Sequence, residues 1–139
     1  MNDVAIGLVQ LSGLVQGLYA RVSQRHDLTP VQAKLLCVLL EGPRGMAELA
    51  GYFGVEKAAL TGLMDRAEKR GLAQREPVPG NRRALTVTLT EEGRRAATDF
   101  STDVHAELEA LVASLTPEGR RHFELAMAEI IERCGGRGC

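Results

Sequence analysis

Two adjacent arginines, Arg82 and Arg83, follow a run of residues that favours the tip of a β-hairpin. The segments 72–75 and 85–89 alternate as strands do, and turn-forming residues separate them. These turn residues are Pro77, Pro79, Gly80 and Asn81. Guanidinium groups at an exposed hairpin tip can bind phosphates or enter the minor groove of duplex DNA. The segment therefore predicts contact with a nucleic acid.

A helix-turn-helix is predicted directly before this hairpin. One helix spans residues 46–53, Gly54 forms the turn, and a second helix begins near Glu56 and stops at Gly71. The exposed side of the second helix is expected to reach into the major groove. The expected DNA contacts are Lys57, Ala58 and Thr61 at base edges, Arg66 at phosphate, and Arg82 and Arg83 in the minor groove or on its flanking phosphates. The alternative for a residue such as Thr61 is an ordinary solvent-facing position.

The charges are unevenly distributed along the 139 residues, although the net charge is only -1. Between Pro43 and Thr86 there are eight basic and five acidic residues, a net charge of +3. From Asp99 to Cys139 there are four arginines and eight acids, a net charge of -4. A basic middle and an acidic end would orient the molecule on DNA. A solvated surface of mixed charge is the alternative.

Capping residues predict where the helix before the helix-turn-helix lies. Thr29 is a good N-cap, Pro30 suits the first helical position, and Gln32 completes a capping box. An apolar run follows, and Gly42 and Pro43 end the helix.

Amphipathic helices are predicted at both ends of the chain. A first helix covers residues 6–22, a long helix runs from Thr90 to about Ser114, and a last helix runs from Thr116 to Gly135. The apolar surface of the first helix is too broad for a short chain to cover alone, which predicts a partner subunit. The expected dimer contacts are Leu8, Leu11, Leu14, Leu111, Phe123, Met127, Ile130 and Ile131.

Three segments together carry a family resemblance: LTPVQAKLL at 28–36, AELAGYFGV at 47–55, and the run 60–93 that ends in NRRALTVTLTEEG. Over nearly its whole length the chain resembles the MarR family of winged-helix transcription regulators. The resemblance implies a homodimer that binds a palindromic operator in double-stranded DNA, usually as a repressor. It also implies that a small aromatic or phenolic compound often releases the DNA.

The expected fold is mainly α with a small β-hairpin, a winged helix-turn-helix flanked by dimerisation helices. Residues 1–28 are expected to form an N-terminal dimerisation helix and residues 29–90 the DNA-binding domain. Residues 91–139 are expected to form C-terminal dimerisation helices.

The wing departs from the family pattern at Asn81, where an aspartate is usual. Asn81 carries no charge for a nearby arginine to bind, so we expect a less ordered wing in the free protein. Backbone order equal to that of the preceding helix would contradict this expectation. Glu56 is also less usual, but an acid suits the N-terminus of a helix, and capping is the favoured interpretation.

An effector site is implied by the resemblance alone, and its lining varies within the family. The polar or aromatic candidates are Tyr19, Arg21, Arg25, His26 and His105. Each could instead be a core or interface residue with a satisfied hydrogen bond. Redox control through Cys37, Cys134 or Cys139 is a second possibility, but Cys37 lies in an apolar run typical of an inert buried thiol.

Other classes of protein find little support in the sequence. There is no phosphate-binding glycine loop, nucleophile elbow or HExxH motif, so neither an enzyme nor a cofactor is expected. His26, His105 and His122 share no metal-ligand spacing, and no metal is expected. The absence of an export signal and of any membrane-length apolar run predicts a cytoplasmic protein. A winged-helix interaction module without sequence-specific DNA binding remains an alternative, and an acidic face on the second helix of the helix-turn-helix would favour it.

Overall fold

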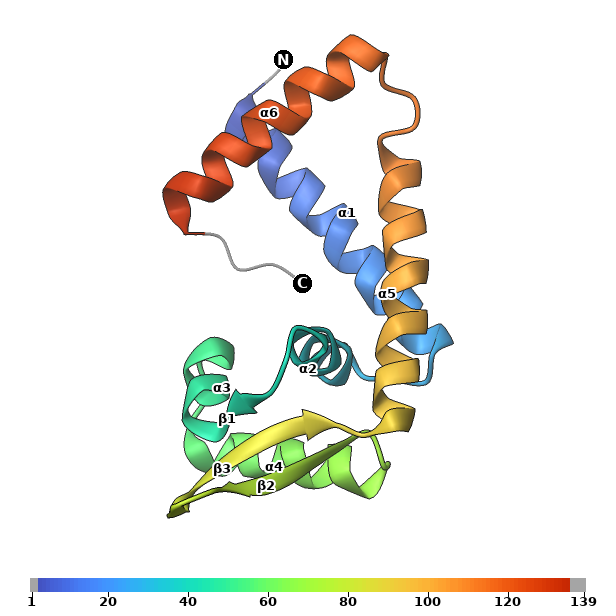
Figure 1. The fold of residues 1–139 in the computed structure, drawn as a ribbon. Helices are drawn as coiled ribbons and strands as arrows, with labels where there is room; N and C mark the ends of the chain where they lie inside the picture. Colours follow the sequence, from blue (N-terminus) through green and yellow to red (C-terminus); the bar gives the residue numbers. More distant parts are fainter. Residues whose placement is uncertain (1–2, 136–139) are drawn as a thin grey trace.

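The computed structural model describes residues 3–135, apart from the side chain of Arg82. Helices form most of the chain, and a small sheet lies at one end of the molecule (Figure 1). The elements are α1 Val4–Arg25, α2 Pro30–Leu40, β1 Arg44–Gly45, α3 Met46–Phe53, α4 Lys57–Lys69, β2 Ala73–Val78, β3 Asn81–Leu89, α5 Glu91–Leu111 and α6 Pro117–Cys134. Among the described residues, no helix is both long enough and apolar enough to cross a membrane.

Two apolar clusters meet at α2, which is buried on more than one side. Leu36 on one side packs with α1 and α5, where Phe100 is fully buried. Leu35 and Leu39 on the other side pack with α3, α4 and the sheet. Helix α2 therefore connects the helix-turn-helix to the long helices.

The predicted capping residues form the expected bonds. The Thr29 hydroxyl accepts the Gln32 backbone N–H at 3.0 Å, and the Gln32 side chain accepts the Thr29 backbone N–H at 3.1 Å. Thr90 and Thr116 accept the backbone N–H groups three residues later, at 2.9 and 3.0 Å. These bonds satisfy backbone donors that have no partner inside the helix, and so they fix where each helix begins.

The hairpin is longer than the sequence predicts. Pro77 belongs to β2, where it pairs with Leu85, so only Pro79 and Gly80 connect the two strands. A proline is tolerated there because β2 is an edge strand in the order β1-β3-β2. Gly80 has a φ of 82°, which lets the chain reverse between the strands. The prediction of Pro77 and Asn81 as turn residues was therefore wrong.

Two further features differ from the prediction. Strand β1 was not predicted. It has only two residues, which pair with Thr86 and Val87 of β3, and so short a strand has no alternation of apolar and polar residues to detect. Helix α5 ends at Leu111, not near Ser114, because Val112 has left the helical conformation. The turn that follows leads into the Thr116 cap of α6.

Helix α5 joins the hairpin through a close backbone contact. The Thr90 backbone N–H donates to the Leu72 carbonyl at 3.1 Å, and its hydroxyl donates to the Gly71 carbonyl at 2.6 Å. A Cβ atom at Gly93 would lie only 1.8 Å from the Leu72 carbonyl oxygen. Only glycine therefore fits at position 93. The close contact and the two Thr90 bonds hold the start of α5 against the base of the hairpin and the end of α4.

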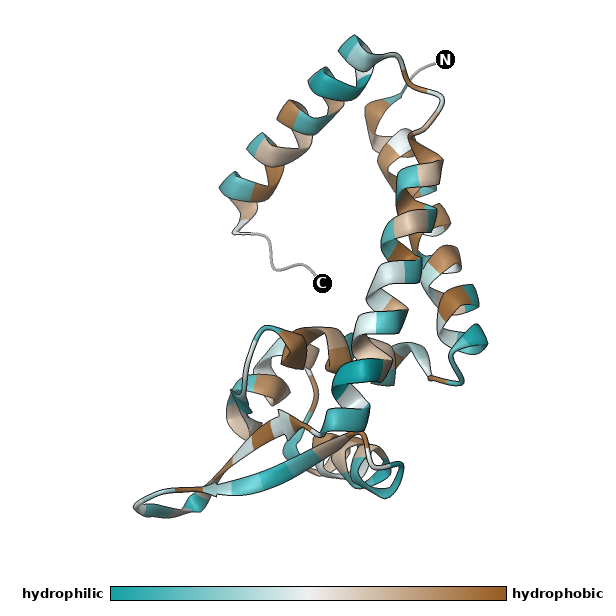
Figure 2. Cartoon of the chain, turned by 45° about the vertical axis from the view of Figure 1, so that its right-hand side comes forward, coloured by the Kyte–Doolittle hydropathy of each residue, from teal (hydrophilic) through white to brown (hydrophobic). Residues whose placement is uncertain are grey.

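The other end of the molecule exposes apolar residues. In Figure 2 the helices α1 and α6, far from the hairpin, carry many hydrophobic residues. Helix α6, all of whose residues the structure describes, buries none of them. The exposed large apolar residues of these two helices and of the end of α5 include Leu8, Leu11, Leu14, Leu111, Met127, Ile130 and Ile131. An apolar surface on this scale is typical of a protein interface.

Candidate nucleic-acid interface

Helix α4 and the hairpin lie together at one end of the molecule (Figure 1). Leu60, Met64 and Ala67 bury one side of α4 in the core. On the other side the residues predicted to read DNA are exposed or half-buried: Lys57, Ala58, Thr61 and Arg66. The core contacts thus fix the helix and leave this side accessible.

The first turns of the accessible side carry few hydrogen-bonding side chains. The Thr61 hydroxyl donates to the Lys57 carbonyl at 2.9 Å, so its oxygen remains available as an acceptor. Lys57 is a charged donor, and Ala58 presents only a methyl group. Glu56 is at the N-cap position, but within the described part of the chain its side chain makes no capping hydrogen bond. Glu56 therefore lies at the helix N-terminus, as expected, but the structure shows no side-chain capping bond there among the residues it describes.

The hairpin presents an arginine near its turn. Arg83 is exposed on β3, and its backbone N–H donates to the Asn81 side-chain oxygen at 3.2 Å. Asn81 therefore organises the start of β3 through a neutral local bond. The Arg82 side chain lies outside what the structure describes.

The acids of α4 are paired with an arginine that sequence reasoning missed. Arg75 of β2 donates to Asp65 at 2.5 Å and also to Glu68. These hydrogen bonds, that to Asp65 first, raise the pKa of Arg75 above its ordinary value, and desolvation opposes part of the rise. Asp65 and Glu68 are three residues apart on one helix face, a spacing that could have indicated a shared partner.

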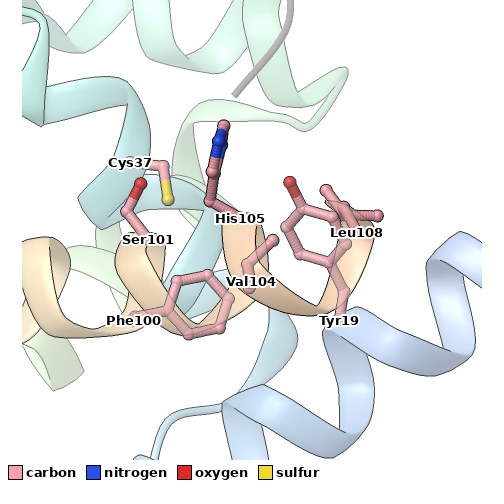
Figure 3. Close-up of a pocket in the computed structure, with 7 residues that line it drawn as sticks. All are labelled: Tyr19, Cys37, Phe100, Ser101, Val104, His105 and Leu108. Carbon is pink, nitrogen blue, oxygen red and sulfur yellow. The ribbon is translucent and has the colours of Figure 1, made fainter. Parts of the chain in front are cut away.

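A small pocket lies between α1, α2 and α5 (Figure 3). Its volume is about 100 Å³, and it is lined by Tyr19, Cys37, Phe100, Ser101, Val104, His105 and Leu108. In Figure 3 the Tyr19 hydroxyl and the His105 ring are both on the side of the pocket away from Phe100. Two of the five effector candidates, Tyr19 and His105, are therefore brought together.

The other effector candidates lie elsewhere. Arg25 forms an ion pair with Glu107, and the His26 ring nitrogen Nε2 is 2.6 Å from an Asp103 carboxylate oxygen. The His26 ring also packs edge-on against Phe100, with a centroid distance of 5.9 Å. Both residues thus connect α1 to α5, while Arg21 is exposed on α1.

The cysteines and histidines are dispersed. Cys37 is buried in the wall of the pocket, Cys134 is exposed at the end of α6, and Cys139 lies outside the described residues. Among residues 3–135 there is no group of three or more histidine, cysteine or acidic side chains that could hold a metal ion.

The arrangement of helix-turn-helix, hairpin and flanking helices has known counterparts. A family model described as the MarR family matches residues 26–84, the region from the end of α1 to the start of β3. The part of the chain that carries the helix-turn-helix and the start of the hairpin thus matches the MarR family. The family and the fold are those of transcriptional regulators, not of enzymes.

Relatives and solved structures extend this match along the chain. The HTH-type transcriptional repressor NicR of Pseudomonas putida is 41% identical over 68 residues, which are 48% of this chain and 43% of NicR. That alignment therefore spans less than half of NicR. The crystal structure of wild-type MarR from Escherichia coli superposes with a TM-score of 0.82 at 22% identity, over 94% of this chain and 98% of MarR. The structure of NadR in complex with 4-hydroxyphenylacetate gives a TM-score of 0.73 at 24% identity, over 94% and 93%. These two likenesses show a MarR winged helix-turn-helix fold.

Proposed function

We propose that this protein is a sequence-specific DNA-binding regulator, a repressor that binds a palindromic operator as a homodimer. A small aromatic or phenolic ligand releases it from DNA. Residues 29–90 bind DNA, and residues 1–28 and 91–139 form the dimer. The observation that carries this proposal is that the hairpin with its exposed Arg83 and the accessible face of α4 lie at the same end of the molecule (Figure 1). On that helix the acids Asp65 and Glu68 are already paired with Arg75.

In this proposal α4 enters the major groove. Lys57 donates to purine acceptors, the Ala58 methyl packs against a thymine methyl, and the Thr61 oxygen accepts from a base amino group. Arg66 contacts phosphate, and Arg82 and Arg83 enter the adjacent minor groove or bind the phosphates that flank it. Base contacts supply specificity, and the arginines supply much of the affinity.

The role of Arg83 can be measured from the salt dependence of binding. Substitution Arg83→Ala removes one phosphate contact, so the slope of log K against log salt should fall in magnitude by about 0.9. The measurement is fluorescence anisotropy with labelled operator at several salt concentrations. Arg121→Ala, which removes an exposed arginine from α6, is the matched control and should leave the slope unchanged. An unchanged slope for Arg83→Ala would remove this residue from the interface.

The dimer is supported by the apolar surface of α1, α6 and the end of α5. Most of the apolar side chains predicted to contact a partner are exposed in the single chain, and the Phe123 side chain is half-buried. A twofold axis through these helices would present the two α4 helices to half-sites about one helical turn apart. The operator would then be palindromic.

The ligand proposal rests on the pocket beside Phe100. NadR, which shares the fold, has been crystallised with a phenolic acid, 4-hydroxyphenylacetate. The pocket here offers an aromatic ring, aliphatic side chains, a phenol and an imidazole. Its volume of about 100 Å³ is small for a ligand site, so binding would require the pocket to widen or a second subunit to complete it.

Isothermal titration with 4-hydroxyphenylacetate tests this pocket. Tyr19→Phe and His105→Leu each remove one polar group, and each should weaken binding by about tenfold. Arg21→Ala changes an exposed residue of the same helix as Tyr19 and should leave the affinity unchanged. Undiminished heats for both pocket variants would place the ligand elsewhere.

The alternative of a protein-interaction module predicts an acidic face on α4. In the structure Asp65 and Glu68 form ion pairs with Arg75. Glu56, at the start of the helix, is exposed and makes no capping bond with a described residue. Lys57 and Arg66 are also exposed on α4, so the face is not dominated by acids. The charge distribution therefore favours DNA.

A further inference from the structure

Arg75 connects the hairpin to helix α4 through two carboxylates at once. Its guanidinium group donates through the Nε atom to Glu68 and through the Nη2 atom to Asp65. The Arg75 side chain is only 22% exposed, whereas that of Asp65 is 59% exposed. The rigid fork of donors on arginine suits such a double contact, which a lysine cannot reproduce.

The position of Asp65 on α4 makes its charge relevant to DNA. Asp65 follows Ala58 by seven residues, about two turns, so both lie on nearly the same side of the helix. Ala58 belongs to the side that we propose to enter the major groove. A carboxylate on that side would repel the phosphates that line the groove, unless a nearby cation offsets its negative charge.

We propose that Arg75 is a positioning residue for DNA binding, which offsets the charges of Asp65 and Glu68 and holds both carboxylates against β2 so that α4 can approach the phosphates. This inference rests on the proposed function. Arg75 acts through the two acids and makes no contact with DNA itself. The raised pKa of Arg75 is consistent with a guanidinium that stays charged throughout the pH range of the protein.

The proposal predicts an order of affinities from the charge of this cluster. The cluster of Asp65, Glu68 and Arg75 carries a net charge of -1, which becomes -2 in Arg75→Gln. In the triple variant Asp65→Asn/Glu68→Gln/Arg75→Gln the net charge is zero. Arg75→Lys keeps the charge while losing the forked geometry. Affinity should therefore follow charge, with the triple variant at least equal to the unsubstituted protein and Arg75→Gln the weakest.

The experiment is anisotropy with a duplex that the unsubstituted protein selects from a random pool. The plots of log K against log salt for Arg75→Gln and the unsubstituted protein should differ in slope by about 0.9 and meet near 1 M salt. Arg75→Gln should then bind about fifteenfold more weakly at 50 mM salt and about fourfold more weakly at 200 mM. The triple variant should recover full affinity, and Arg75→Lys should keep the original salt slope. Far-ultraviolet circular dichroism confirms that each variant is folded before binding is compared.

Two results would overturn the proposal, and they differ from failure of the proposed function. A folded triple variant that binds as weakly as Arg75→Gln would mean that Arg75 contacts phosphate directly or serves only as a structural tie. Equal affinity of Arg75→Gln and the unsubstituted protein would mean that the two acids do not face the DNA. If the unsubstituted protein itself selects no sequence, the proposed function fails, and the role of Arg75 in DNA binding fails with it.

Discussion

Substitution Gly93→Ala is expected to lower the free energy of unfolding by about 3 kcal/mol or more. The added methyl group would lie 1.8 Å from the Leu72 carbonyl oxygen and 2.7 Å from its carbonyl carbon. Both atoms belong to the backbone, so no side-chain rotation can relieve the clash. The start of α5 would have to move away from the base of the hairpin and break the bonds that Thr90 makes there.

Thermal unfolding followed by circular dichroism, at one fixed protein concentration, measures this effect. The melting temperature should fall by about 10 °C. Gly51→Ala is the matched control, because a Cβ atom there meets nothing within 4 Å and the residue is inside helix α3. Alanine should be neutral or stabilising at that position, by up to about 1 kcal/mol. Equal melting temperatures for the two variants would contradict the close contact at Gly93.

The second large effect is expected at the proposed dimer surface, for the substitution Ile130→Glu. The Ile130 side chain is 54% exposed in the single chain, and in a twofold dimer each subunit would bury a carboxylate without a partner. The dimer should dissociate at micromolar concentration. Because a monomer binds only one half-site, affinity for the full operator should fall by at least about a hundredfold.

Leu125→Glu provides the control on the same helix. Leu125 is 60% exposed and lies about 140° around the helix from Ile130, so it faces away from the apolar stripe. Analytical ultracentrifugation should find a monomer for Ile130→Glu and a dimer for Leu125→Glu. A dimer in both cases would show that α6 does not form the interface, even if other helices do.

Helix α5 offers a physical connection between the pocket and the DNA-binding end. Phe100 and His105 line the pocket near the middle of this helix, and Gly93 holds its first turn against the hairpin base. A ligand that displaces α5 would therefore shift the hairpin and the end of α4 together. Such a ligand can weaken DNA binding only by as much as it prefers the displaced state.

The helix starts were predictable because they depend on local chemistry. Thr29, Thr90 and Thr116 each lie directly before a helix-favouring segment and accept a backbone N–H three residues later. The ends of the hairpin were not predictable from the same kind of signal. Pro77 lies in a strand because β2 is at the edge of the sheet, which is a property of the tertiary structure.

The candidate site was only partly predictable for a similar reason. Helical spacing placed Lys57 and Ala58 on the accessible side of α4, as the structure has them. The spacing of Asp65 and Glu68 could indicate a shared partner, but not that this partner is Arg75, because Arg75 reaches them from another element. His26 was a reasonable effector candidate as a polar aromatic residue, but Asp103, 77 residues later, holds it between α1 and α5.

Selection from a random duplex pool, followed by anisotropy on the enriched sequence and a scrambled control, measures whether this protein reads a DNA sequence. We expect an enriched palindrome with half-sites about 10 base pairs apart. We also expect binding at least about a thousandfold tighter than to the scrambled duplex, with two subunits per site. A pool that shows no enrichment, with equal and weak binding to any duplex tested at every salt concentration, would contradict sequence-specific DNA binding.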